Sequence, residues 1–133
     1  MIVVDPEKLL RGKIEADGIL VLNRESLDVA KVENHRVILQ GPGEYEVNGI
    51  KISAIKAGKH LAYRLYVDGI GIALANASSL ESVKDFVSGQ QVFILSVDAS
   101  IDPSVLATLE PKVCLFYGDK VKEIIKDGIT TAK

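Results

Sequence analysis

The chain has 133 residues, of which 47% are hydrophobic and 26% charged, and its formal net charge is −2. This length suits one domain, the apolar content excludes a disordered or fibrous protein, and the slight negative charge argues against nucleic-acid binding through bulk charge. Two histidines and one cysteine exclude an intrachain disulfide framework and a multi-histidine metal site.

Short apolar runs in the first part of the chain predict β-strands. Ile2–Val4 stops at an Asp-Pro pair, Gly18–Leu22 is a continuous apolar run of strand length, and His35–Gln40 is a third candidate. The start of the chain lacks the basic and apolar regions of a signal peptide, and no apolar run approaches the roughly 18 residues that span a bilayer. We therefore expect a soluble cytoplasmic protein.

Two dipeptides in the middle of the chain predict tight hairpins. Asn48-Gly49 and Asp68-Gly69 each separate two strand-like segments. Both favour the two-residue type I′ turn, in which both central residues need a positive φ. The second turn predicts three cross-strand pairs, which are Val67 with Ile70, Leu65 with Ile72, and Tyr63 with Leu74.

The hydrophobic period changes to that of helices from residue 78 onward. Ser78 and Glu81 fit a capping box at the start of one helix, and Asp102-Pro103 resembles an N-cap followed by proline at N1 of a second. Asp119 begins a third predicted helix. Between these helices, Gln91–Val97 and Lys112–Tyr117 are predicted as buried strands. Such strand-helix alternation implies right-handed parallel crossovers over the helix-strand-helix portion at 78–128.

The segment at 41–49, GPGEYEVNG, resembles one branch of the metallo-β-lactamase superfamily. That branch contains small zinc-dependent hydrolases similar to ascorbate-phosphate lactonases. The resemblance implies the α+β class and a single domain over 1–133. Its fold would be a shortened metallo-β-lactamase-like αβ/βα sandwich, with antiparallel hairpins followed by β-α-β-α-β-α. Other pieces resemble the same branch in the same order, namely Val4-Asp5-Pro6, Gly18–Leu22, Tyr63–Ile72, Val92–Val97 and Glu110–Val113.

The metal-binding motif of that family is changed in this sequence. Members hold one or two metal ions with an H-x-H-x-D-H motif, and the metal activates a bound water. The matching histidine positions here hold Asn23, Glu25 and Asp28, and the aspartate position holds Leu27. Arg24 adds a positive charge that opposes a cation. Because these positions are changed, we expect no catalytic residue, no metal ligand and no cofactor.

The family's remaining ligand positions are changed as well. Its bridging aspartate falls near Asn76 or Ala77, and its last histidine near Gly118. The loop that supplies another histidine is nearly absent, because Ala57-Gly58-Lys59 runs straight into a strand. His60 is therefore predicted as the first residue of that strand and takes no ligand role.

Several other polar residues have a simpler structural interpretation. Glu25 and Asp28 could form a weak oxygen site for a hard cation, or begin a surface helix, where acidic residues favour the first turn. Glu44 and Glu46 lie two apart on a strand and are predicted on a solvated face. Cys114 is predicted to behave as a small buried hydrophobe. The histidines His35 and His60 are interpreted as strand-edge residues, the serines Ser78 and Ser79 as helix caps, and Gly41-Pro42-Gly43 as a turn without the helix of a phosphate loop.

Three functions remain open at this point. We favour a non-catalytic protein that serves as a structural or interaction subunit, because a shortened fold exposes a sheet edge or face that another copy can cover. This predicts a homodimer or higher homo-oligomer.

The second function is a metal-dependent hydrolase with a reduced site, acting on a small phosphorylated or lactone-like substrate. Only this hypothesis requires zinc. The third is a small anionic-ligand binding domain, with Arg24 as the charged contact. No nucleic-acid or membrane partner is expected. The residual cleft would be lined by Asn23, Arg24, Glu25, Asp28 and Asn76.

Overall fold

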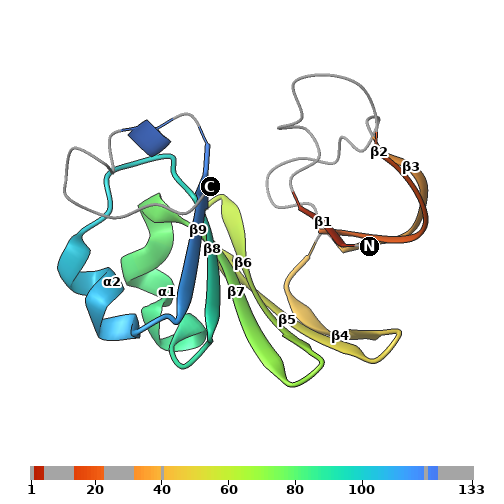
Figure 1. Ribbon diagram of the computed structural model, residues 1–133, viewed down its shortest axis with the longest axis horizontal. Helices are drawn as coiled ribbons and strands as arrows, with labels where there is room; N and C mark the ends of the chain where they lie inside the picture. The colour runs from red at the N-terminus through yellow and green to blue at the C-terminus, as the bar shows by residue number, and fades with distance from the viewer. Residues whose placement is uncertain (1, 5–13, 23–31, 40, 119, 123–133) are drawn as a thin grey trace. The chain divides into compact units, whose positions relative to one another are not determined.

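The computed structural model describes residues 2–4, 14–22, 32–39, 41–118 and 120–122 (Figure 1). The chain divides into two compact units, Met1–Pro42 and Gly43–Lys133. Whether both belong to one domain over 1–133, as the sequence suggests, stays a prediction. No helix within the described ranges is long and apolar enough to cross a membrane.

The first unit contains a three-stranded parallel sheet with the order β1-β2-β3. Its strands are β1 (Ile2–Val4), β2 (Ile14–Leu22) and β3 (Val32–Leu39). The expectation that antiparallel hairpins come first is therefore wrong for this unit. Both longer strands also begin earlier than predicted, because their first residues include the charged or polar Glu15, Asp17, Glu33 and Asn34, which precede the apolar residues on which the prediction rests.

The second unit contains a six-stranded mixed sheet with the order β4-β5-β6-β7-β8-β9 (Figure 1). The strands from β4 to β7 are antiparallel, and β7, β8 and β9 run parallel to one another. The parallel arrangement predicted for the strands of the second half is therefore confirmed, whereas Asp119, where the sequence predicts the start of a third helix, lies outside the described residues. The elements are β4 (Gly43–Val47), β5 (Ile50–Ala57), β6 (His60–Val67), β7 (Ile70–Asn76), the 3₁₀ turn η2 (Ala77–Ser79), α1 (Leu80–Val87), β8 (Val92–Ser96), α2 (Pro103–Leu109) and β9 (Val113–Tyr117).

The predicted hairpins form at the expected residues. Asn48 and Asp68 have φ of 50° and 49°, and the glycine that follows each has φ of 80°, as a type I′ turn requires. The predicted pairing of β6 with β7 is confirmed in every pair. A third tight turn joins β5 to β6, with Gly58 at φ 64°, and His60 is indeed the first residue of β6.

Helices α1 and α2 lie on one face of the six-stranded sheet (Figure 1). In α1, Leu80, Val83 and Val87 are buried at helical spacing, and in α2 Leu109 is buried. They pack on small residues of the central strands, such as Ala73, and on Phe93 of β8. Small residues on the sheet allow helices to approach closely, so the core under α1 and α2 is compact.

The opposite face of the sheet is also apolar. Strand alternation places Ile52, Tyr63, Leu65 and Leu74 there, and all four are buried. Toward β9 this face becomes exposed. The prediction that Lys112–Tyr117 forms a buried strand is therefore wrong: β9 is the last strand of the described sheet, and Val113 and Leu115 are 45% and 38% exposed. A continuous apolar run does not reveal whether both faces of a strand are covered.

Candidate functional site

Polar side chains gather at one end of the central strands of the six-stranded sheet, where β7 and β8 finish and β6 begins. Asn76 is the last residue of β7, Ser78 lies in η2, and Asp98 follows β8. His60 begins β6, which is antiparallel to β7 and therefore starts at the end of the sheet where β7 finishes. The carboxyl ends of parallel strands are where α/β proteins commonly place ligands. This strand-end cluster of four residues is therefore the candidate site.

Asp98 is the centre of the strand-end cluster. Its Oδ1 accepts a hydrogen bond from the Ser78 backbone N–H at 2.9 Å. Its Oδ2 accepts one from the Ser78 hydroxyl at 2.6 Å and a longer one from the Asn76 amide at 3.3 Å. His60 Nε2 lies 3.6 Å from the same Oδ2. Asn76 is almost fully buried at 1% exposure, whereas the Asp98 side chain is 29% exposed.

These contacts determine the charge of Asp98. Partial burial raises the pKa of its carboxyl, but the hydrogen bonds from Ser78 and Asn76 outweigh burial and hold the pKa below its ordinary value of 3.8. Asp98 is therefore ionised at neutral pH. Hydrogen bonds to a charged acceptor are stronger than those between neutral groups, so the carboxylate fixes η2 against the end of β8.

The described residues of the cluster supply too few ligand groups for a zinc ion. Structural zinc takes four protein ligands and catalytic zinc three, usually His, Cys, Asp or Glu. Of the described cluster residues, His60 and Asp98 offer two such groups. Within the part of the chain that the structure describes, no three His, Cys, Asp or Glu residues gather closely enough to hold a metal ion.

Only one of the five predicted cleft residues falls within the described ranges. Asn76 lies in the strand-end cluster, where its amide donates to Asp98 rather than facing an open site. The other predicted residues, Asn23, Arg24, Glu25 and Asp28, lie outside the described residues. Asp98 itself was not predicted, although an acidic residue directly after a buried strand is a signal for this position.

The predicted capping box at the start of α1 is wrong. Ser79, not Ser78, occupies the N-cap, and it makes no side-chain capping bond. Ser78 instead donates both its N–H and its hydroxyl to Asp98. Glu81 pairs with Lys84 at 2.9 Å rather than reaching back to the cap. The ionised Asp98 is a stronger acceptor than a neutral partner, and the intervening 3₁₀ turn shifts the start of the helix by one residue.

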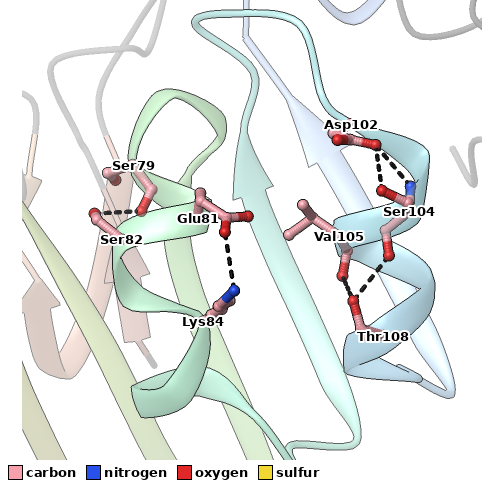
Figure 2. A network of polar contacts seen from close by, with 8 residues as sticks. All are labelled: Ser79, Glu81, Ser82, Lys84, Asp102, Ser104, Val105 and Thr108. Carbon is pink, nitrogen blue, oxygen red and sulfur yellow. Dashed lines mark hydrogen bonds and ion pairs between the residues drawn. The ribbon is translucent and has the colours of Figure 1, made fainter.

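A groove of about 630 Å³ lies between α1 and α2 and is lined partly by hydroxyl and charged side chains. Figure 2 shows polar contacts within each helix, such as Glu81 with Lys84 on α1 and Asp102 with Ser104 on α2. The predicted N-cap Asp102 is confirmed, since it accepts hydrogen bonds from the Ser104 N–H and hydroxyl at 2.9 and 2.7 Å. Those bonds hold the pKa of Asp102 below its ordinary value. Thr108 donates to the Ser104 and Val105 carbonyls. The groove is thus lined by helix caps and helix-surface pairs.

Of the remaining candidates, Cys114 is partly buried rather than fully buried, and the glutamates and the glycine-rich turn confirm their simpler interpretations. Burial raises the pKa of the Cys114 thiol to about 11, which makes it unreactive near neutral pH. Glu44 and Glu46 are both exposed on β4, and Glu44 accepts a hydrogen bond from Ser53 at 2.8 Å. The glycine-rich turn before residue 43 leads into strand β4, not into a helix.

Comparison with known proteins supports the fold. The chain resembles a crystal structure from Thermotoga maritima that is provisionally described as a Zn-dependent hydrolase of the metallo-β-lactamase superfamily. The TM-score is 0.65 and the sequence identity 17%, over 98% of this chain and 77% of the other. No family model matches the sequence, and no curated protein matches it. The chain thus has a metallo-β-lactamase-like fold, which agrees with the resemblance seen at GPGEYEVNG.

Proposed function

We propose that this protein is a non-catalytic member of the metallo-β-lactamase fold that acts as a self-associating structural or interaction subunit. The observation that carries the proposal is the strand-end cluster. Both oxygens of Asp98 are engaged by Ser78, and Asn76 donates to the same carboxylate. These residues hold the loops together where a metal-dependent enzyme would present open ligands.

The sequence supports the same proposal at the positions that match the family's metal motif. Asn23 and Leu27 cannot replace a histidine and an aspartate as zinc ligands, and Arg24 adds a positive charge. Among the residues that the structure describes, the strand-end cluster supplies two ligand groups, His60 and Asp98, which is fewer than a zinc site needs.

A binding site for a small anion has less support at the strand-end cluster. An anion at Asn76 would meet the ionised Asp98, whose Oδ2 lies 3.3 Å from the Asn76 amide nitrogen. An anion bound to that amide would lie close to the carboxylate, and the two negative charges would repel each other. The amide also already has Asp98 as its acceptor.

Elemental analysis of protein purified without chelators, with the mass measured on the same sample, tests the proposal. We expect no stoichiometric zinc, manganese or iron, and a mass above the 14.4 kDa of one chain. His60→Gln and Asp98→Asn are informative variants if metal is found. One metal ion per chain that both variants lose would overturn the proposal in favour of a hydrolase with a reduced site.

A further inference from the structure

The two outer strands of the six-stranded sheet differ in how they are protected. β4 carries the exposed Glu44 and Glu46, and such charges discourage pairing with another strand. β9, Val113–Tyr117, contains neither a charged residue nor a proline. Its exposed Val113 and Leu115 add apolar surface next to the edge. An uncharged apolar edge strand is a ready template for pairing with another chain.

The backbone of β9 can accept such a partner. The Val113 N–H donates to the Gln91 carbonyl at 3.1 Å, and the Tyr117 carbonyl accepts from Val97 at 2.7 Å, so these residues face the β8 side. Alternate residues of a strand direct their N–H and C=O groups to opposite sides. Cys114 and Phe116 therefore direct theirs to the outer side, where the described sheet has no further strand.

We propose that two copies of this chain pair through β9, antiparallel and with the two-fold axis at Leu115, so that their six-stranded sheets become one. Cys114 then lies opposite Phe116 of the second copy, and these residues exchange backbone hydrogen bonds. This pairing uses the outward-facing groups of both residues in each copy. The inference rests on the self-association in the proposed function and names the surface that carries it.

The side chains are compatible with this register. Leu115 meets Leu115 of the second copy, and Val113 meets Tyr117, so only apolar groups lie directly opposite each other. Aromatic and β-branched cross-strand pairs are favourable. The same arrangement on β4, centred at Tyr45, would place Glu44 opposite Glu46 of the second copy. Like charges directly opposite destabilise a strand pair, which favours β9 over β4 as the interface.

The short strand predicts a reversible dimer. An edge strand of this length buries less surface than the ~1,200 Å² at the lower end of stable interfaces. We therefore expect monomer and dimer to exchange, with the dimer fraction rising with protein concentration. Sedimentation over a concentration series should show a limit at twice the 14.4 kDa chain mass.

Charge reversal at the two-fold axis tests the register. Leu115→Lys and Leu115→Glu each place like charges opposite one another and should shift each variant to monomer, while an equimolar mixture should restore the dimer. Leu115 is partly exposed, and thermal unfolding will verify that each variant folds. The matched control is Ile70→Lys, which changes a residue of 45% exposure on the same face of β7 and should leave the dimer intact.

A cysteine cross-link gives a positive readout for the same register. Directly opposed residues in a non-hydrogen-bonded antiparallel pair have Cα atoms ~4.5 Å apart, within the range of a disulfide. Leu115→Cys in a Cys114→Ala background should form a covalent dimer on oxidation. Val113→Cys in the same background should not, because Val113 faces Tyr117 rather than itself.

The outcomes separate this inference from the proposed function. A dimer that persists in Leu115→Lys, or that Ile70→Lys disrupts equally, overturns pairing through β9 and leaves self-association standing. A wild-type chain that remains monomeric at every concentration overturns both. A stoichiometric metal ion in a dimer that Leu115→Lys dissociates would overturn the non-catalytic role and retain the β9 interface.

Discussion

Two aspartates four residues apart show how differently one kind of interaction can act in this protein. Asp98 binds Ser78 and Asn76, which lie about twenty residues away on other elements, in a partly buried position. Asp102 binds Ser104 at the exposed start of its own helix. Both carboxyls have a pKa below the ordinary value because of these hydrogen bonds. Asp98 thus supports tertiary structure, whereas Asp102 supports one helix end.

Replacing Asp98 should cause the largest loss of stability. Asp98→Ala removes the acceptor of the Ser78 N–H and hydroxyl and of the buried Asn76 amide. Because hydrogen bonds to charged groups contribute more than neutral ones, and the Asn76 donor is buried, we expect a loss of about 2–3 kcal/mol in the free energy of unfolding. Urea denaturation measures it. A loss no larger than that of Asp102→Ala would contradict the distinction between the two aspartates.

The stability of the fold should also fall in acid through Asp98. Its pKa in the folded state lies below the value of 3.8, so folding favours the ionised form. The stabilisation is thus fully present above the unfolded pKa and is lost as the pH falls through the folded pKa. Thermal unfolding of wild type and Asp98→Asn between neutral pH and pH 2 tests this. The variant should be less stable at neutral pH and show a shallower loss in acid; parallel curves would refute the prediction.

The sequence predicts the local features of the fold and misses those that depend on distant partners. The turns at Asn48 and Asp68 follow from residues that tolerate a positive φ, and each fixes the register of a hairpin. The cap at Asp102 is equally local. By contrast, the contact of Ser78 with Asp98 joins elements separated by a helix and a strand, so the local pattern suggested a capping box instead. Asn76 was found only through the family resemblance.

Loss of the cap at Asp102 should have a smaller effect than loss of Asp98. Asp102→Ala removes the acceptor for the first turn of α2, but Pro103 at N1 still favours the helical φ. We expect a modest fall in the midpoint temperature of unfolding, well under that of Asp98→Ala. Asp102→Ser is the matched control, since serine also caps helices, and it should recover most of the loss. Equal loss in both variants would show that the charge, not the cap, matters.

The smallest effect is expected at the ion pair on α1. Lys84 Nζ lies 2.9 Å from Glu81 Oε1, and both side chains are largely exposed, at 50% and 66%. The Glu81 carboxylate raises the pKa of Lys84, yet exposed pairs gain little because water and salt screen the charges and the side chains lose entropy. Lys84→Gln should leave the urea midpoint within experimental error at physiological salt. A loss comparable to that of Asp102→Ala would mean that this pair stabilises the packing of α1 against α2. Exposed polar contacts would then contribute more to the free energy of unfolding than the difference between Asp98 and Asp102 predicts.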